Sequence, residues 1–236
     1  MGANMNTNPE ASAAPAQLVK KLRELTGAGF SDCRQALVES AGDMDKAVDY
    51  LRKKGQAAAK KKAEREATDG LVSTYIHAGG KIGVLIEVNC ESDFVARTDE
   101  FQKLCHDIAM HIAAIDPRYL RREDVPPEIV QREIDLNREQ ARQSKKPEAV
   151  IEKIATGKME KFYEDSCLYE QHFIKDETLT IKELVDQAIA KMGEKISVRR
   201  FVRMKVGDVT ATYASGTLAR KSDDDDAAGA PVPPVS

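Results

Sequence analysis

Four consecutive residues near the middle of the chain, Ser92-Asp93-Phe94-Val95, place a hydroxyl, a carboxylate and an aromatic ring side by side. They follow the aliphatic run from Ile82 to Val88, which predicts a mostly buried strand that would hold them rigidly. An aromatic ring next to an acid at the exit of a rigid strand suits prying at a protein surface. Spacing alone favours a plainer interpretation, in which Phe94 belongs to the core and Asp93 is an acid in the first turn of a helix.

The sequence contains none of the residue patterns on which covalent catalysis or metal binding usually depends. No glycine-rich phosphate loop occurs. The adjacent Cys105 and His106 would diverge by about 100° on a helix, so they should not form a nucleophile and base pair. The four histidines and four cysteines lack the spacing of metal ligands, and the acidic run from Asp223 to Asp226 lacks the glycine and glutamate of a calcium loop. We therefore expect no catalytic residue, metal or cofactor.

Composition places the chain among globular proteins in which helices dominate. Hydrophobic residues make up 42% of the 236 positions, enough for a real core, whereas charged residues reach 32% and aromatic residues only 5%. A net charge of −3 gives no global attraction to nucleic acid, so we expect no direct nucleic-acid partner. No segment approaches the ~20 apolar residues that span a bilayer, and residues 1–16 lack Lys and Arg. We expect a cytoplasmic protein without a membrane partner.

The N-terminal part of the chain predicts three short helices. Residues 1–16 have little to bury, and we expect them to be disordered. Within residues 17–55, apolar side chains recur at helical spacing, Gly27 can end the first helix, and Gly55 can end the third. Residues 56–69 are rich in alanine and lysine and have no apolar face, so they predict an exposed basic linker.

The remainder of the chain predicts an α+β core over residues 70–208. A β-hairpin within residues 71–90 and a strand from Ile196 to Val206 would form a three-stranded antiparallel sheet packed with helices. Two amphipathic helices joined by a short polar connection predict an inserted antiparallel helical hairpin at about residues 124–167. Residues 209–236, with their acidic run and Pro-rich end, predict a disordered tail.

Two stretches of the chain resemble signatures of the translation elongation factor Ts family. One runs from Leu22 to Leu37 and reads Leu-Arg-Glu-Leu-Thr-Gly-Ala-Gly-Phe-Ser-Asp-Cys-Arg-Gln-Ala-Leu; the other runs from Glu87 to Arg97 and reads Glu-Val-Asn-Cys-Glu-Ser-Asp-Phe-Val-Ala-Arg. The family usually has Thr where this chain has Ser92, a change that keeps the hydroxyl. The resemblance covers nearly all of residues 17–207 and is greatest to the short form, which has a single core subdomain.

The resemblance implies a guanine nucleotide exchange factor that performs no covalent chemistry. It would bind elongation factor Tu in its GDP-bound and nucleotide-free states. Ser92, Asp93, Phe94 and Val95 would enter near the partner's magnesium and phosphate site, disturb it and promote GDP release, so that GTP can bind.

The resemblance also implies three features away from this stretch. The N-terminal helices would adopt a ubiquitin-associated-like fold and dock on the partner through Phe30 and Ser31. Members often carry Met where this chain has Ser31, so the apolar contact would rest mainly on Phe30. His111 would contact another partner domain, or else be a half-buried helix residue, and both interpretations stay open. Relatives of the short form favour a homodimer.

Two other classes of function compete with this interpretation. The triplet Gly29-Phe30-Ser31 resembles the loop of ubiquitin-associated domains, which suggests a ubiquitin-binding adaptor. The basic residues between Lys60 and Arg65 suggest an RNA-binding helper, although the absence of interleaved aromatics favours a solvated charged face. The stretch from Glu87 to Arg97 has no role in either class.

Overall fold

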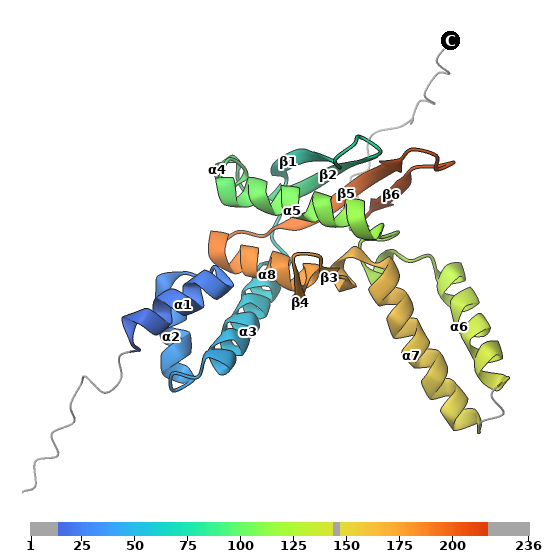
Figure 1. Ribbon diagram of the computed structural model, residues 1–236, viewed down its shortest axis with the longest axis horizontal. Coiled ribbons are helices and arrows are strands. Elements are labelled where there is room, and N and C mark those ends of the chain that lie inside the picture. Colours follow the sequence, from blue (N-terminus) through green and yellow to red (C-terminus); the bar gives the residue numbers. More distant parts are fainter. Residues whose placement is uncertain (1–13, 144–146, 217–236) are drawn as a thin grey trace, which may run out of the picture.

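The structure is a computed structural model that describes residues 14–143 and 147–216. Three helices gather at one end of the molecule, a sheet with helices on one face forms its middle, and a helical hairpin projects at the other end (Figure 1). The α+β class predicted from the sequence is confirmed. The disorder expected for residues 1–13 and 217–236 concerns positions outside the described residues.

The N-terminal helices are α1 (Ala16–Thr26), α2 (Phe30–Glu39) and α3 (Met44–Lys62). Gly27 ends α1 as predicted, with a φ of 66° that favours glycine. The three helices enclose a small apolar cluster of their own, made of Val19, Leu22, Cys33, Ala36, Leu37 and Ala47. The described part of the N-terminus is therefore a three-helix bundle.

The third helix is longer than the sequence predicted. We expected Gly55 to end it and residues 56–69 to form an exposed linker, but α3 continues well into that segment. Gly55 is buried because α3 packs on α8 (Ile181–Met192), and a Cβ at Gly55 would lie 3.5 Å from the backbone oxygen of Asp186. Ala59, one turn further along α3, packs against the main core, which is the large apolar cluster between the sheet and its helices. Small residues that form no apolar stripe thus allow a close contact between two helices.

The sheet has four antiparallel strands in the order β1-β2-β5-β6. Its strands are β1 (Asp69–Ile76), β2 (Ile82–Cys90), β5 (Ser197–Lys205) and β6 (Thr212–Ser215). The first three match the predicted sheet. Since β5 pairs with β2 across more than a hundred residues, the sheet encloses the intervening helices in one unit.

The fourth strand corrects two predictions. The sheet was expected to have three strands, and residues 209–236 were expected to be disordered, but β6 pairs with residues 200–203 of β5. Ala214 is the one buried residue in β6. A four-residue strand with a single buried side chain carries no periodic signal, so its pairing depends on the neighbouring strand rather than on its own sequence.

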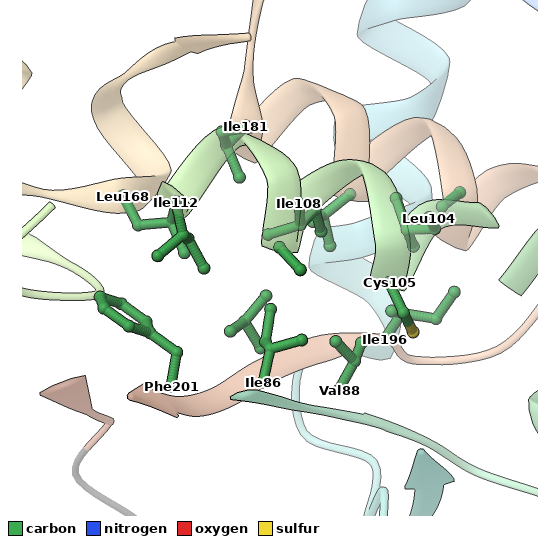
Figure 2. Packing of buried hydrophobic residues seen from close by; sticks show 14 of the residues in the cluster. Ile86, Val88, Leu104, Cys105, Ile108, Ile112, Leu168, Ile181, Ile196 and Phe201 are labelled. Carbon is green, nitrogen blue, oxygen red and sulfur yellow. The ribbon is translucent and has the colours of Figure 1, made fainter. Parts of the chain in front are cut away.

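The helix α5 (Asp99–Ile115) packs on one face of the sheet, and α8 contributes side chains to the same apolar core. Figure 2 shows Ile86, Val88 and Phe201 of the sheet directed towards Ile108 and Ile112 of α5. All five side chains are buried. Because burying each such side chain contributes ~1.5–3 kcal/mol, this contact is the main source of stability for the region around the sheet.

The helical hairpin consists of α6 (Pro127–Arg142) and α7 (Glu148–Ser166). Arg138 donates to both carboxylate oxygens of Glu152, at 2.9 and 3.1 Å, and Arg142 pairs with Glu148. Because the later residue of α6 pairs with the earlier residue of α7, the two helices run antiparallel. The inserted hairpin therefore has the arrangement that the sequence predicted.

Short elements connect the hairpin to the core. They are η2 (Arg122–Asp124), η3 (Leu168–Glu170), and the two-stranded sheet of β3 (His172–Phe173) and β4 (Asp176–Thr180). Arg122 donates to both carboxylate oxygens of Glu170 at 2.9 Å, which ties the two ends of the hairpin together. Among the described helices, none has the length and apolar character needed to cross a membrane.

Candidate partner-binding site

The stretch that follows β2 forms one short helix, α4 (Asp93–Ala96). We call residues 91–96 the exit turn. Ser92 is the N-cap of α4, and its hydroxyl accepts a hydrogen bond from the Val95 amide at 3.5 Å. Asp93 lies in the first turn of α4, as the plainer interpretation of the sequence expected, and forms an ion pair with Arg97.

The side chain of Phe94 is 88% exposed, so the expectation that it belongs to the core is wrong. The reason is the shortness of α4. Val95 packs against the main core and Ala96 is buried, and these two residues occupy the inward positions of a single turn. Phe94, about 100° before Val95 around the helix axis, is left pointing outward.

An exposed phenylalanine forgoes the stability that burial would give it. Burying a Phe side chain contributes ~1.5–3 kcal/mol, which this fold does not gain at Phe94. A single exposed apolar residue is common on protein surfaces and needs no explanation by itself. What distinguishes Phe94 is the number of long-range contacts that hold the backbone beneath it.

Glu194 lies in the connection between α8 and β5 and contacts the exit turn directly. Its Oε2 accepts hydrogen bonds from the backbone amides of Glu91 and Ser92, at 3.1 and 3.0 Å. Its Oε1 accepts a hydrogen bond from the Ser92 hydroxyl at 2.5 Å. One carboxylate therefore satisfies three donors at the point where β2 ends and α4 begins.

Glu91 of the exit turn in turn contacts the connection between α8 and β5. Its Oε1 accepts a hydrogen bond from the backbone amide of Lys195 at 2.6 Å, and Arg65 donates to both of its carboxylate oxygens. The Lys195 amide and the charge of Arg65 hold the pKa of Glu91 below its ordinary value. The Lys195 ammonium in turn donates to the backbone oxygen of Arg65 at 2.6 Å. These contacts join three segments that are far apart in the sequence.

Gly70 supports the exit turn from the strand on its other side. It lies opposite Asn89 in the β1–β2 pair, and its φ of 139° lies in the region that favours glycine. A Cβ at this position would overlap the backbone oxygen of Val88. The side-chain Nδ2 of Asn89 also donates to the backbone oxygen of Asp69 at 3.0 Å, so the last residues of β2 are closely held.

Of the four residues predicted to contact a partner here, the structure exposes only Asp93 and Phe94. Ser92 and Val95 are half-buried and are engaged in holding the turn. Sequence reasoning missed Glu194. An acid directly after a helix-ending glycine is ordinary, and its partner lies 102 residues earlier, so no local signal could have identified it.

The remaining predicted residues lie elsewhere. Phe30 begins α2 and is 58% exposed, and Ser31 beside it is also exposed. His111 is fully buried on α5, where its Nε2 lies 3.0 Å from the Gln171 side-chain oxygen and its Nδ1 accepts from the Ile174 amide. His111 has an exposed fraction of 0% in this structure, so it is more deeply buried than the half-buried helix residue of one of the two interpretations.

The four cysteines are free and buried. Burial raises the pKa of Cys90 to about 11 and that of Cys105 to about 12, so both thiols stay protonated at neutral pH. The Cys90 thiol donates to the backbone oxygen of Ser92 at 3.2 Å. Burial and a raised pKa are properties of cysteines that fill the core rather than react. Within the part of the chain that the structure describes, no group of three or more His, Cys, Asp or Glu side chains is placed to hold a metal ion.

A family model and curated proteins that match this chain carry the same name. The family model described as elongation factor TS matches residues 43–207, which include the exit turn and Glu194. Curated relatives with the name elongation factor Ts include one from Fervidobacterium nodosum, 57% identical over 82% of this chain and 98% of its own length, and one from Koribacter versatilis, 58% identical over 83% and 90%. The chain belongs to the elongation factor Ts family. A member from Carboxydothermus hydrogenoformans is 53% identical over 88% of this chain and 92% of its own length.

Membership in the elongation factor Ts family confirms the resemblance drawn from the two signatures. The second signature, residues 87–97, lies wholly within the region matched by the family model, whereas Phe30 and Ser31 precede it. The relatives cover more than four-fifths of this chain and nearly all of their own length, so the relationship extends over the fold as a whole.

Proposed function

We propose that this protein is a guanine nucleotide exchange factor for elongation factor Tu, with Asp93 and Phe94 acting at the partner's magnesium and phosphate site. The observation that carries the proposal is the geometry of the exit turn: an aromatic side chain is 88% exposed on backbone that Glu194 and Glu91 hold in place. Membership in the elongation factor Ts family supports the choice of partner.

Exchange needs no bond to be made or broken. A factor that binds nucleotide-free elongation factor Tu more tightly than the GDP-bound form must weaken GDP binding by the same ratio, because the two binding equilibria are linked. If the ring of Phe94 enters an apolar crevice only after the phosphate site has opened, its burial supplies ~1.5–3 kcal/mol. That energy corresponds to about a 10- to 150-fold shift in the GDP equilibrium.

The two exposed side chains would have different parts in this process. The carboxylate of Asp93 carries negative charge into a site built to hold a magnesium ion and phosphate groups, where it perturbs the coordination of the metal. The ring of Phe94 occupies space and keeps the site open. Ser92 and Val95 would support both from within the turn rather than touch the nucleotide site themselves.

Docking would be shared with the N-terminal helices. We assign the exposed Phe30 and Ser31 at the start of α2 to contact with the partner. Such contacts affect how tightly the factor binds, whereas the exit turn affects how fast GDP leaves once the complex has formed. We place this activity in the cytoplasm, in translation elongation.

We also propose that the protein forms a homodimer through the sheet face that α5 and α8 leave uncovered. Leu85 pairs with Val202, and Val202 pairs with Tyr213 on the next strand, so the three side chains form a row across the sheet. Leu85 and Tyr213, together with Val72 on β1, are exposed. A symmetric contact would cover the same apolar row on both copies.

The function is tested by the rate of GDP release. Elongation factor Tu would be loaded with fluorescent GDP and chased with excess unlabelled nucleotide, with and without the protein. We expect release to accelerate with protein concentration and to reach a plateau. An unchanged release rate at saturating concentration would contradict the proposed function.

A further inference from the structure

We propose that Glu194 is a positioning residue for nucleotide exchange: its carboxylate fixes the backbone of the exit turn and thereby sets the direction in which Phe94 projects. This inference rests on the proposed function and deepens it. Glu194 itself would not touch the partner's nucleotide site. It acts through Phe94, from the connection between α8 and β5.

The first support is the set of groups that Glu194 satisfies. The amides of Glu91 and Ser92 follow the last residue of β2 and precede the first residue of α4, so they lie beyond both the strand pairing and the helix. Both donate to Oε2, while the Ser92 hydroxyl donates to Oε1 and also caps α4. The angle between strand and helix is therefore fixed at the carboxylate of Glu194.

The second support is the rigidity of the element that carries Glu194. Gly193 caps the end of α8 with a φ of 77°, and β5 begins at Ser197, so only four residues connect a packed helix to a strand in the sheet. Lys195, within this connection, donates its amide to Glu91. The contact thus runs in both directions, and rotation of the exit turn would break both halves of it.

The third support is the exposure of Phe94. The ring packs against little of its own chain, so the direction of its Cα–Cβ bond is set by the backbone of the exit turn rather than by packing around the side chain. A residue that holds this backbone therefore sets the direction in which the side chain leaves the turn. Misplacement of a working group by about 1 Å can reduce a rate by up to about 100-fold, so loss of the carboxylate should appear in the exchange rate before it appears in docking.

The contact can be tested without a partner. Protection of the Glu91 and Ser92 amides from hydrogen exchange would be measured by NMR in the whole protein and in the variants Glu194→Ala and Glu194→Gln. Both amides should lose protection in Glu194→Ala and lose part of it in Glu194→Gln, which keeps one acceptor oxygen. Unchanged protection in Glu194→Ala would overturn the proposal, because these amides would then be held by something else.

The role in exchange is tested with the same variants. The maximal GDP release rate should fall about 10-fold in Glu194→Ala, and less in Glu194→Gln, while the concentration at half-maximal rate changes less than about twofold. Glu170→Ala is the matched control, because it also removes a half-buried carboxylate that accepts a hydrogen bond at each oxygen, in this case both from Arg122 at the base of the hairpin. It should leave the maximal rate unchanged. If Glu194→Ala does not fold, Glu194→Gln carries the test, because it keeps the size of the side chain and one acceptor oxygen, and its maximal rate should still lie below that of the wild type.

A double variant separates positioning from general destabilisation. In a Phe94→Ala background, Glu194→Ala should slow exchange by less than about twofold further, since the group that it positions is already absent. A full maximal rate in Glu194→Ala, or effects of the two substitutions that simply multiply, would overturn the proposal. A wild-type protein that does not accelerate GDP release would instead overturn the proposed function, while the amide protection would still report whether the contact exists.

Discussion

The exit turn and the α1–α2 turn (residues 27–30) each present an exposed aromatic side chain, but they are held in different ways. Phe94 projects from a turn tied to segments about a hundred residues away through Glu194 and Lys195. At the α1–α2 turn, Gly29 caps α2 without a side-chain hydrogen bond, and the bonds made by Thr26 and Cys33 span two to five residues. A turn fixed from outside suits a group that must arrive in one orientation. A turn held by local bonds suits a contact that can adapt to its partner.

The glycines beneath the two turns give the largest contrast in stability. Gly70→Ala should lower the free energy of unfolding by about 3 kcal/mol or more, because the new Cβ overlaps the Val88 carbonyl and the backbone is unsuited to alanine. Gly27→Ala should cost only about 1–2 kcal/mol, since the space around it is open and only the backbone conformation is unfavourable. Urea denaturation of both variants checks this. Equal losses would contradict the view that the exit turn is the more tightly held.

The uncovered sheet face lies outside both turns, and we expect a substitution there to change the oligomeric state. Leu85→Glu should convert a homodimer into a monomer, because it replaces an exposed apolar member of the row with a charge. Light scattering gives the oligomeric state, and Thr74→Glu on the same face beside the row is the milder control. A wild-type protein that is already monomeric would remove the homodimer from the account.

Phe30 should affect docking more than rate. Phe30→Ala is expected to raise the concentration at half-maximal exchange about 5- to 10-fold, as one apolar contact is lost, with the maximal rate changed less than about twofold. Its stability should be nearly unchanged because the side chain is exposed. Calorimetric affinity and exchange titrations would show this. A reduced maximal rate at full occupancy would mean that the α1–α2 turn does more than dock.

We expect the smallest effect at His111, and we expect it in the free energy of unfolding alone. Burial lowers the pKa of His111 from its ordinary value of 6.5, an effect that the bond to Gln171 only partly offsets. Because the unfolded chain takes up the proton first, stability should fall as pH drops below about 6.5 and level off below the folded-state pKa. The pH-dependent stability due to His111 is measured by comparing unfolding curves of the wild type and His111→Gln between pH 7.5 and 5, because the variant lacks the imidazole. An identical pH dependence in both would show that His111 does not contribute.

Sequence patterns predicted most of the elements because those elements bury side chains at regular intervals. The strand from Ile82, the helix that follows Thr98 and the helical hairpin all show such intervals. Sequence patterns did not predict elements whose packing depends on small residues or on pairing with a neighbouring strand. Gly55 and Ala59 let α3 continue against α8 without an apolar stripe, and Thr212–Ser215 became a strand only because β5 offers an edge.

The candidate site was predictable in place but not in detail. Resemblance to the elongation factor Ts family pointed to residues 92–95, whereas spacing alone would have put Phe94 in the core. Phe94 points outward and Val95 points inward because α4 is only one turn long. The contact with Glu194 spans 102 residues and has no local counterpart in the sequence.

We infer that the exit turn accelerates GDP release while the α1–α2 turn contributes affinity. The most direct test compares Phe94→Ala with Phe30→Ala in one assay that follows release of fluorescent GDP from elongation factor Tu over a full titration. We predict that Phe94→Ala lowers the maximal rate by about 10-fold or more and leaves the concentration at half-maximal rate within about twofold, with no loss of thermal stability, whereas Phe30→Ala does the reverse. A normal maximal rate for Phe94→Ala would contradict the account.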